Sequence, residues 1–315
     1  MFRSLLVPLD GSPFAEHALP LALSIARRAG AELQLVYVHT SPEADYPGHH
    51  FLNEESWVSE WKTRHGVYLD DIAQRLRAAG ARAVTPLVLQ GDHGDVAGII
   101  GKHAIAAGTG LVVMTTHARG TMERLWLGSV ADQLIRETAR PLLLVRPTEG
   151  PADLSADKYL KHILIPLDGT PLAEQILEPA IALGEGMGPE YTLLRVNRPV
   201  APIHYPPEGA MAAPLPTGMS QQLARVETEV RLKAEEYLDE VAQRLRGRLL
   251  RVRTKIVEEA QPALAVMETA QQLPADLIAM QTHGRRGLAR LVLGSVADKV
   301  LRGSAVPLLL QRPSP

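Results

Sequence analysis

The amino-acid sequence repeats itself once, and this repeat restricts the possible folds more than any other feature of the chain. Three blocks recur in the same order: RSLLVPLDGSPFAEHAL and KHILIPLDGTPLAEQIL, YLDDIAQRLR and YLDEVAQRLR, and TTHARGTMERLWLGSVADQLIRETARPLLLVRP and QTHGRRGLARLVLGSVADKVLRGSAVPLLLQRP. A repeated unit of this length is a whole domain, because the units of solenoid proteins span only about 20 to 50 residues. The sequence of 315 residues therefore predicts two related domains, residues 1–150 and 158–315, joined by a linker at about 148–158.

Within each copy of the repeat, short apolar runs rich in Val, Leu and Ile alternate with longer stretches of helical periodicity. In the first copy the apolar runs are 4–9, 33–38, 84–89, 111–114 and 142–145, and the clearest helical pattern is Phe14, Ala18, Leu21, Ala22 and Ile25. Such alternation predicts parallel strands joined by crossover helices. We expect an α/β fold with two tandem doubly wound, Rossmann-like domains, each a five-stranded parallel sheet flanked by helices. A ligand is expected where the strand order reverses, at the carboxyl ends of the strands.

Composition excludes several classes of function. The chain has no cysteine, so it has no disulfide, cysteine nucleophile or thiolate metal site. With 33 Lys and Arg against 35 Asp and Glu, the net charge of -2 favours neither a nucleic acid nor a membrane as partner. The first residues run directly into an apolar strand-like segment without the apolar core of a signal peptide, so we expect a cytoplasmic protein.

Two segments fit neither strands nor helices of the repeat. Residues 40–66 contain His49-His50, and residues 197–222 contain the proline-rich stretch NRPVAPIHYPPEGAMAAPLPTG. Because proline interrupts helices and central strands, we interpret the second segment as a loop, lying either over a ligand cleft or on the surface. Adjacent histidines rarely coordinate one ion, so we expect no metal site at His49-His50.

Gly-Ser precedes a helical run in both copies, as LGSVADQLI at 127–135 and LGSVADKVL at 293–301. Glycine permits a close approach of the backbone, serine supplies donors, and the dipole of the helix favours an anion. The pattern is therefore typical of a phosphate site. A simpler alternative is that Gly-Ser only turns the chain and begins the helix.

The segments before these helices, MTTHA at 114–118 and MQTHG at 280–284, make the sequence resemble the universal stress protein family, whose ATP-binding members carry Gly-x2-Gly-x9-Gly-Ser/Thr here. The second copy matches at Gly284, Gly294 and Ser295, with Gln281 in place of the first glycine. The first copy matches at Gly128 and Ser129, and has Thr115 and Ala118 in place of the two earlier glycines. The resemblance covers nearly the whole chain apart from the linker and the two unusual segments.

The resemblance implies a nucleotide site in each copy. Asp10 and Asp168 would contact the ribose or a metal bound to the phosphates, although an Asx-type turn before a helix explains them equally well. The remaining residues implied to bind nucleotide are Pro8, Val38, Met114, Thr115, Ala118, Gly128, Ser129 and Val130 in the first copy, and Pro166, Val196, Met280, Gln281, Gly284, Gly294, Ser295 and Val296 in the second. The prolines and the valines Val38 and Val196 would line the adenine pocket.

The function implied by the resemblance is a stress-response regulator that binds adenine nucleotide, ATP with Mg²⁺, and changes its assembly or partner contacts accordingly. No positioned nucleophile or water-activating group is evident, so slow ATP hydrolysis or self-phosphorylation is the second hypothesis. The third is a scaffold without nucleotide. The C-terminal copy is expected to bind more tightly, because Gly284 keeps a family glycine and Gln281 could turn its side chain outward.

The last apolar runs, PLLLVR at 141–146 and PLLLQR at 307–312, are too apolar to remain open sheet edges in water. We therefore predict that the two domains pair through these strands as a pseudo-dimer. Family resemblance further implies a homo-oligomer, a dimer of tandem chains. In contrast, Arg251, Arg253 and Lys255 alternate along a strand, which is typical of an exposed edge.

Overall fold

The computed structural model describes residues 2–40, 54–91, 95–116, 127–200, 217–282 and 293–313. The strands are β1 (Ser4–Pro8), β2 (Glu32–Thr40), β3 (Val84–Gly91), β4 (Leu111–Thr115), β5 (Leu142–Val145), β6 (His162–Pro166), β7 (Glu190–Asn197), β8 (Arg251–Glu258), β9 (Leu277–Gln281) and β10 (Leu308–Gln311). The helices are α1 (Pro13–Glu16), α2 (Leu19–Ala29), α3 (Glu54–Ala78), α4 (Val96–Ala106), α5 (Ser129–Glu137), α6 (Pro171–Glu174), α7 (Leu177–Gly184), α8 (Thr217–Arg246), α9 (Pro262–Gln272) and α10 (Ser295–Gly303). The α/β class and the five strands of each copy are as predicted.

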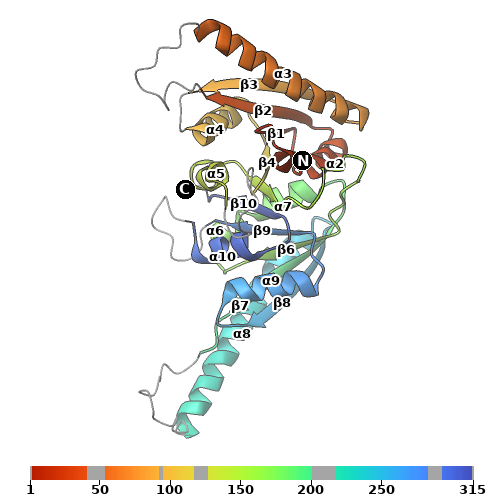
Figure 1. The fold of residues 1–315 in the computed structure, drawn as a ribbon. Coiled ribbons are helices and arrows are strands. Elements are labelled where there is room, and N and C mark those ends of the chain that lie inside the picture. Colours follow the sequence, from red (N-terminus) through yellow and green to blue (C-terminus); the bar gives the residue numbers. More distant parts are fainter. Residues whose placement is uncertain are drawn as a thin grey trace, which may run out of the picture.

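All ten strands form one sheet in the order β3-β2-β1-β4-β5-β10-β9-β6-β7-β8 (Figure 1). Within each copy the strands pair in parallel. The two halves join through an antiparallel pairing of β5 with β10, in which Leu143 lies opposite Leu309. The predicted pairing of the copies through their last strands is therefore confirmed.

Two layers of helices cover the sheet and form two hydrophobic cores. Helices α2, α3, α7 and α8 pack on one face, and α4, α5, α9 and α10 pack on the other. Side chains alternate between the faces, so Leu5 and Val7 of β1 enter the first core and Leu6 enters the second. Each core contains residues from both copies, which makes the junction part of the interior.

The first helical segment is shorter than its periodicity predicts. Residues 13–25 do not form one helix: α1 ends at Glu16, and α2 begins at Leu19 with Pro20 in its first turn. Proline lacks the N–H that would continue the preceding helix, whereas the first turn of a new helix tolerates it. Phe14, which belonged to the predicted apolar face, is 38% exposed as a result.

The two unusual segments are partly helical. Helix α3 begins at Glu54 and α8 at Thr217, so the interpretation of 197–222 as a loop is wrong for its last six residues. Thr217 is the first residue after the prolines, and helix formation becomes possible from that point. Residues 41–53 and 201–216, including His49-His50, lie outside the described part of the chain.

Strand β8 is one end of the sheet, as its alternating charges predict. Val252 is buried, whereas its neighbours Arg251 and Arg253 are exposed. Arg253 forms an ion pair with Glu190 on the adjacent strand β7, and Lys255 donates to the side chain of Gln272 at 3.1 Å. These charged side chains protect the edge from pairing with another strand.

Candidate functional site

The strand order reverses between β1 and β4 in the first copy and between β6 and β9 in the second. Crossovers leave these strands in opposite directions, and the crevice at their carboxyl ends is where open α/β sheets bind ligands. Pro8 ends β1, and Met114 and Thr115 end the neighbouring β4. The equivalent residues of the second copy lie at the corresponding ends of β6 and β9, so the fold places the predicted residues at both switch points.

Asp10 and Asp168 organise the turns that follow β1 and β6. An oxygen of the Asp10 carboxylate accepts from the N–H of Ser12 at 2.9 Å and from its hydroxyl at 2.6 Å. Asp168 makes the same two bonds to Thr170, at 3.0 and 2.6 Å. Ser12 and Thr170 in turn cap α1 and α6. The predicted Asx-type turn is thus present in both copies, and it fixes a carboxylate beside the switch point.

Gly128 and Gly294 tie the beginnings of α5 and α10 to the ends of β4 and β9. The N–H of Gly128 donates to the carbonyl of Thr116 at 2.8 Å, and that of Gly294 donates to Thr282 at 2.7 Å. Glycine has no side chain that could cap the helix that follows, so the next N–H groups, beginning with Ser129, depend on another acceptor. This arrangement suits an anion at the amino end of each helix.

The predicted apolar residues gather on one side of the sheet. Met114 and Met280 are buried in the core beneath α4, α5, α9 and α10. Val38, Val130, Val196 and Val296 are partly buried against the same core. The structure therefore brings together the apolar residues from the end of β2, the end of β4 and the start of α5, and it repeats this arrangement in the second copy.

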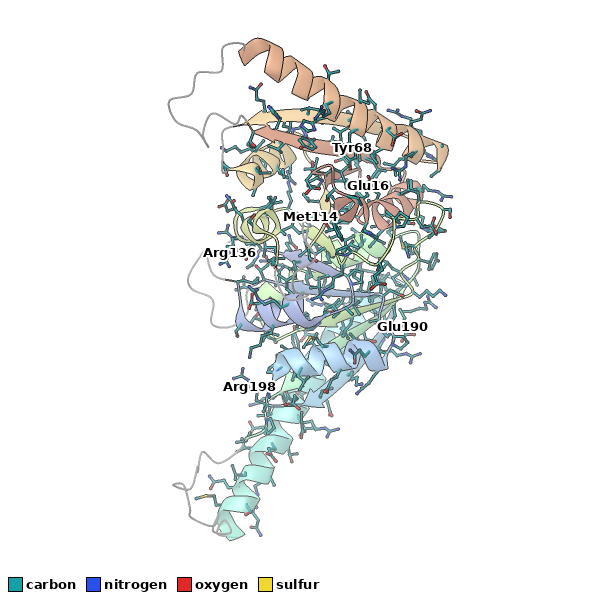
Figure 2. The ribbon with its side chains drawn as sticks, viewed as in Figure 1. Glu16, Tyr68, Met114, Arg136, Glu190 and Arg198 are labelled. Carbon is teal, nitrogen blue, oxygen red and sulfur yellow. The ribbon has the colours of Figure 1, made fainter. Side chains whose placement is uncertain are left out.

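The long helices α3 and α8 are anchored beside the aspartate turns. The hydroxyl of Tyr68 donates to Glu16 of α1 at 3.4 Å, and Arg75 lies 3.1 Å from the same carboxylate (Figure 2). Burial, reinforced by Glu16, raises the pKa of Tyr68 far above its usual value. In the second copy Arg244 and Glu174 form the equivalent ion pair.

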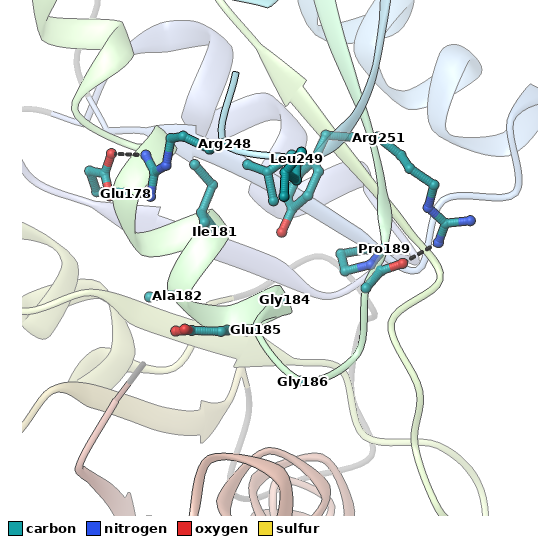
Figure 3. Close-up of a pocket in the computed structure, with 13 residues that line it drawn as sticks. Glu178, Ile181, Ala182, Gly184, Glu185, Gly186, Pro189, Arg248, Leu249 and Arg251 are labelled. Carbon is teal, nitrogen blue, oxygen red and sulfur yellow. Dashed lines mark hydrogen bonds and ion pairs between the residues drawn. The ribbon is translucent and has the colours of Figure 1, made fainter. Parts of the chain in front are cut away.

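A cavity of about 370 Å³ lies at the other end of the second copy (Figure 3). Its wall includes Pro189 before β7, Arg251 at the start of β8, and Glu178 of α7. Arg248 and Glu178 form an ion pair at its rim. These residues lie at the amino ends of the strands, so this cavity is separate from the switch-point crevice.

The described ranges contain neither a cluster of metal ligands nor a membrane-spanning helix. Among those residues, no group of three or more His, Asp or Glu side chains is arranged to hold a metal ion. In the same part of the chain, no helix combines the length and apolarity needed to cross a membrane.

A model of the universal stress protein family matches residues 1–146 and again residues 160–312. The chain belongs to the universal stress protein family. A universal stress protein of Mycolicibacterium smegmatis is 26% identical over 319 residues, covering 98% of this chain and 97% of the relative. A universal stress protein of Thermus aquaticus is 32% identical over 146 residues, which are 46% of this chain and 100% of the relative. The tandem arrangement is thus shared with relatives of full length.

Solved structures agree on the fold of this universal stress protein. One from Archaeoglobus fulgidus has a TM-score of 0.67 at 18% identity and covers 99% of each chain. A functionally unknown protein of Pseudomonas aeruginosa has a TM-score of 0.64 at 19% identity, covering 99% of this chain and 93% of its own. At these identities the likeness establishes the fold alone.

Three of the four family-pattern positions of each copy belong to the described residues, and the remaining one lies outside them. Ala118 and Gly284 are the positions that lie outside, as do the neighbouring histidines and arginines. Thr115 and Gln281 end their strands and are buried. With its amide in the orientation that satisfies both groups, the nitrogen of Gln281 donates to the carbonyl of Gln311 and the oxygen accepts from the N–H of Ile176 at 3.2 Å. Its side chain is therefore not turned outward, because it finds these partners in the interior.

A group of rings beside the first aspartate turn was missed by the sequence analysis. Tyr37 of β2 stacks on His65 of α3 with ring centroids 3.8 Å apart, and His39 lies 5.9 Å from His65. Tyr37 also lies 3.8 Å from the position of a side chain at Gly11. Burial, followed by the influence of His39, lowers the pKa of His65. The second copy has Arg195 and Asn197 at the equivalent strand positions, so this wall differs between the sites.

Proposed function

We propose that this universal stress protein binds ATP with Mg²⁺ at both switch points, and that occupancy changes its assembly or its contacts with a partner in a stress response. The proposal rests on one arrangement that both copies share. A turn fixes the carboxylate of Asp10 or Asp168, and beside it α5 or α10 begins without a side-chain cap, at a glycine that is hydrogen-bonded to the end of the neighbouring strand. Membership of the family, and the match of Gly284, Gly294 and Ser295 to the pattern of its ATP-binding members, support adenine nucleotide as the ligand.

Each group has a distinct task in this proposal. The first N–H groups of α5 and α10 bind phosphate oxygens, and the helix dipole favours their negative charge. Val38 of β2 and Val196 of β7 line the two adenine pockets, together with Pro8 and Pro166. Asp10 and Asp168 contact the ribose, or bind Mg²⁺ together with phosphates. A single carboxylate suits Mg²⁺, which usually retains waters and takes few protein ligands. The metal would supply charge neutralisation at the phosphates.

The groups assigned to the site, namely the first N–H groups of α5 and α10 and the carboxylates of Asp10 and Asp168, are groups that bind phosphate, ribose or Mg²⁺. We therefore favour a binding module over an ATPase. A specific observation supports the scaffold without nucleotide in the second copy, namely the buried Gln281 at a position where the family has glycine. Tighter binding by the second copy consequently remains a prediction that depends on Gly284.

Asp10→Asn and Asp168→Asn test the site without removing the turns, because an amide oxygen still accepts the two hydrogen bonds. Loss of a charge-assisted contact costs roughly 1.5–3 kcal/mol, so each change should weaken ATP binding about ten-fold or more at its own site. Isothermal titration with and without magnesium measures this. Asp153→Asn is the matched control, because Asp153 forms the same turn with Ser155 in the linker, at 2.9 and 2.6 Å.

Unchanged ATP affinity in both site variants would remove the basis for the site. Release of phosphate with repeated turnover would instead favour the ATPase. Sedimentation of the full chain with and without ATP tests the proposed dimer of tandem chains. The proposal also includes a cytoplasmic location and the division into two domains at residues 148–158. Limited proteolysis tests the division, because an accessible linker there should be cut first.

A further inference from the structure

Two arginines cross the junction between β5 and β10 in opposite directions. Arg146 follows β5 of the first copy, and its guanidinium donates to the carbonyl of Leu301 at 3.1 Å and to that of Arg302. Arg312 follows β10 of the second copy and donates to the carbonyl of Arg136 at 2.8 Å. Each arginine therefore reaches the last turn of a helix that belongs to the other copy.

These contacts satisfy groups that a helix cannot satisfy by itself. The last four carbonyls of α5 and α10 have no partner further along the helix. A cation at this end is also favoured by the helix dipole. Both arginines are half-buried, and burial lowers the pKa of the Arg146 guanidinium. A partly desolvated cation depends on such partners, so the contact should fix the position of the helix end.

The other end of each helix is connected to the same strands. The N–H of Gly128, at the start of α5, donates to the carbonyl of Thr116, and the N–H of Thr116 donates to Val145 at 3.0 Å. Val145 is the last residue of β5 and is followed directly by Arg146. The beginning of α5 is thereby linked through three residues to the end of α10.

The second copy makes the return connection. Gly294, at the start of α10, donates to Thr282, and the N–H of Thr282 donates to the carbonyl of Gln311 at 2.9 Å. Gln311 precedes Arg312, which holds the end of α5. The hydrogen bonds, together with the two helices, thus form a closed ring that passes through both candidate phosphate sites.

We propose that each copy uses its arginine to position the phosphate-facing helix of the other copy, so that occupancy of one site raises the affinity of the second. This inference rests on the proposed nucleotide sites, which both helices face with their amino ends. An anion at the start of α5 orders that helix, and its far end holds Arg312 beside Gln311 and the second site. Allosteric factors typically begin at about five-fold, and we expect a factor of this size here.

Hydrogen exchange of the full chain without nucleotide tests the positioning itself. Arg312→Met should accelerate exchange in α5, which belongs to the other copy, by about ten-fold, and should leave α10 unchanged. Arg146→Met should do the reverse, accelerating α10 alone. Arg140→Met is the control, because it removes a cation just after α5 without cutting a bond across the junction. If a methionine variant does not fold, the lysine variant of the same arginine is used, with a smaller effect in the same helix.

Unchanged exchange in the opposite helix, or equal acceleration of both helices, would overturn the inference.

ATP titration then measures the coupling. The wild type should bind its second ATP about five-fold more tightly than the first after statistical correction, and the arginine variants should bind the two ATP molecules independently. Independent sites in the wild type would refute the coupling. A wild type that binds no ATP would instead refute the proposed function, while the exchange result would still decide whether the helices are held across the junction.

Discussion

At the scale of single residues, Leu249 carries a backbone strain that its counterpart avoids. Leu249 lies in the turn that follows α8, with φ at 62°, and its side chain is 95% exposed. The equivalent residue after α3 is Gly80, with φ at 92° and the same pattern of terminal hydrogen bonds. A residue with a Cβ is disfavoured in this left-handed region, whereas glycine adopts it readily. The second copy therefore has a strained residue that contributes almost no burial.

Leu249→Gly should raise the free energy of unfolding by about 1 kcal/mol, because it relieves this strain without removing a buried side chain. Urea denaturation followed by circular dichroism measures the change. The reciprocal substitution, Gly80→Leu, should destabilise the protein by a similar amount. Equal stability of Leu249→Gly and the wild type would show that the left-handed conformation at this position costs nothing.

The residues of the candidate site were predictable where they depend on local chain geometry. The sequence Asp-Gly-Ser before Pro13 predicts the observed turn, and Gly-Ser before a helical run predicts the start of α5. The orientation of Gln281 was not predictable, because its partners come from β10 and from the start of α7. Tyr37 and His65 meet for the same reason: their contact depends on how α3 packs, which no local pattern reports.

At the scale of secondary structure, strand β7 contains a buried phenol. Tyr191 is 1% exposed, and its burial raises the pKa of the phenol to about 12 from a usual value of 10.0. Arg248 lowers this pKa and Glu185 raises it, both by less than burial does. Folding therefore favours the neutral phenol. The raised pKa of Tyr191 stabilises the folded protein fully below pH 10, and this stabilisation is lost as the pH rises toward 12. In that range the phenol of the unfolded chain releases its proton at a lower pH than the phenol of the folded chain does.

Tyr191→Phe should remove this part of the alkaline destabilisation. Two pKa units correspond to roughly 2–3 kcal/mol, so the wild type should lose about this much more stability than the variant between pH 10 and pH 12. Chemical denaturation at a series of pH values measures the difference. Tyr159→Phe is the control, because Tyr159 is 43% exposed. Parallel profiles of stability against pH for the wild type and Tyr191→Phe would show that Tyr191 does not cause this part of the alkaline destabilisation.

The strands were the most predictable elements, since the five apolar runs of the first copy became five strands with nearly the predicted ends. Continuous apolar runs are required when helices cover both faces of a sheet. Helix limits were less predictable. Periodicity alone joined α1 to α2, although Pro20 separates them, and the start of α8 was concealed by the prolines before Thr217.

At the scale of the whole molecule, the junction of the two copies was predictable from the apolarity of β5 and β10. The reciprocal contacts of Arg146 and Arg312 were not, because each depends on a helix more than 150 residues away in the chain. The sequence predicted the linker at 148–158 as a connection between the domains, but it did not predict the contacts that the linker makes. In the structure it is held along α2, where Arg28 donates to Asp157 at 2.9 Å and the hydroxyl of Ser24 accepts from the N–H of Lys158 at 2.9 Å.

This continuity predicts that the two copies unfold together. The sheet passes through the β5–β10 junction without a break, and both cores contain residues of both copies. Leu76 of α3 and its counterpart Leu245 of α8 are both buried, one in each copy. Leu76→Ala or Leu245→Ala should cost about 2–5 kcal/mol each. In scanning calorimetry each change should lower one common transition, because neither half retains its core when the other unfolds. Two transitions, of which each variant moves only one, would show instead that the copies are energetically independent and that the shared sheet contributes little to their stability.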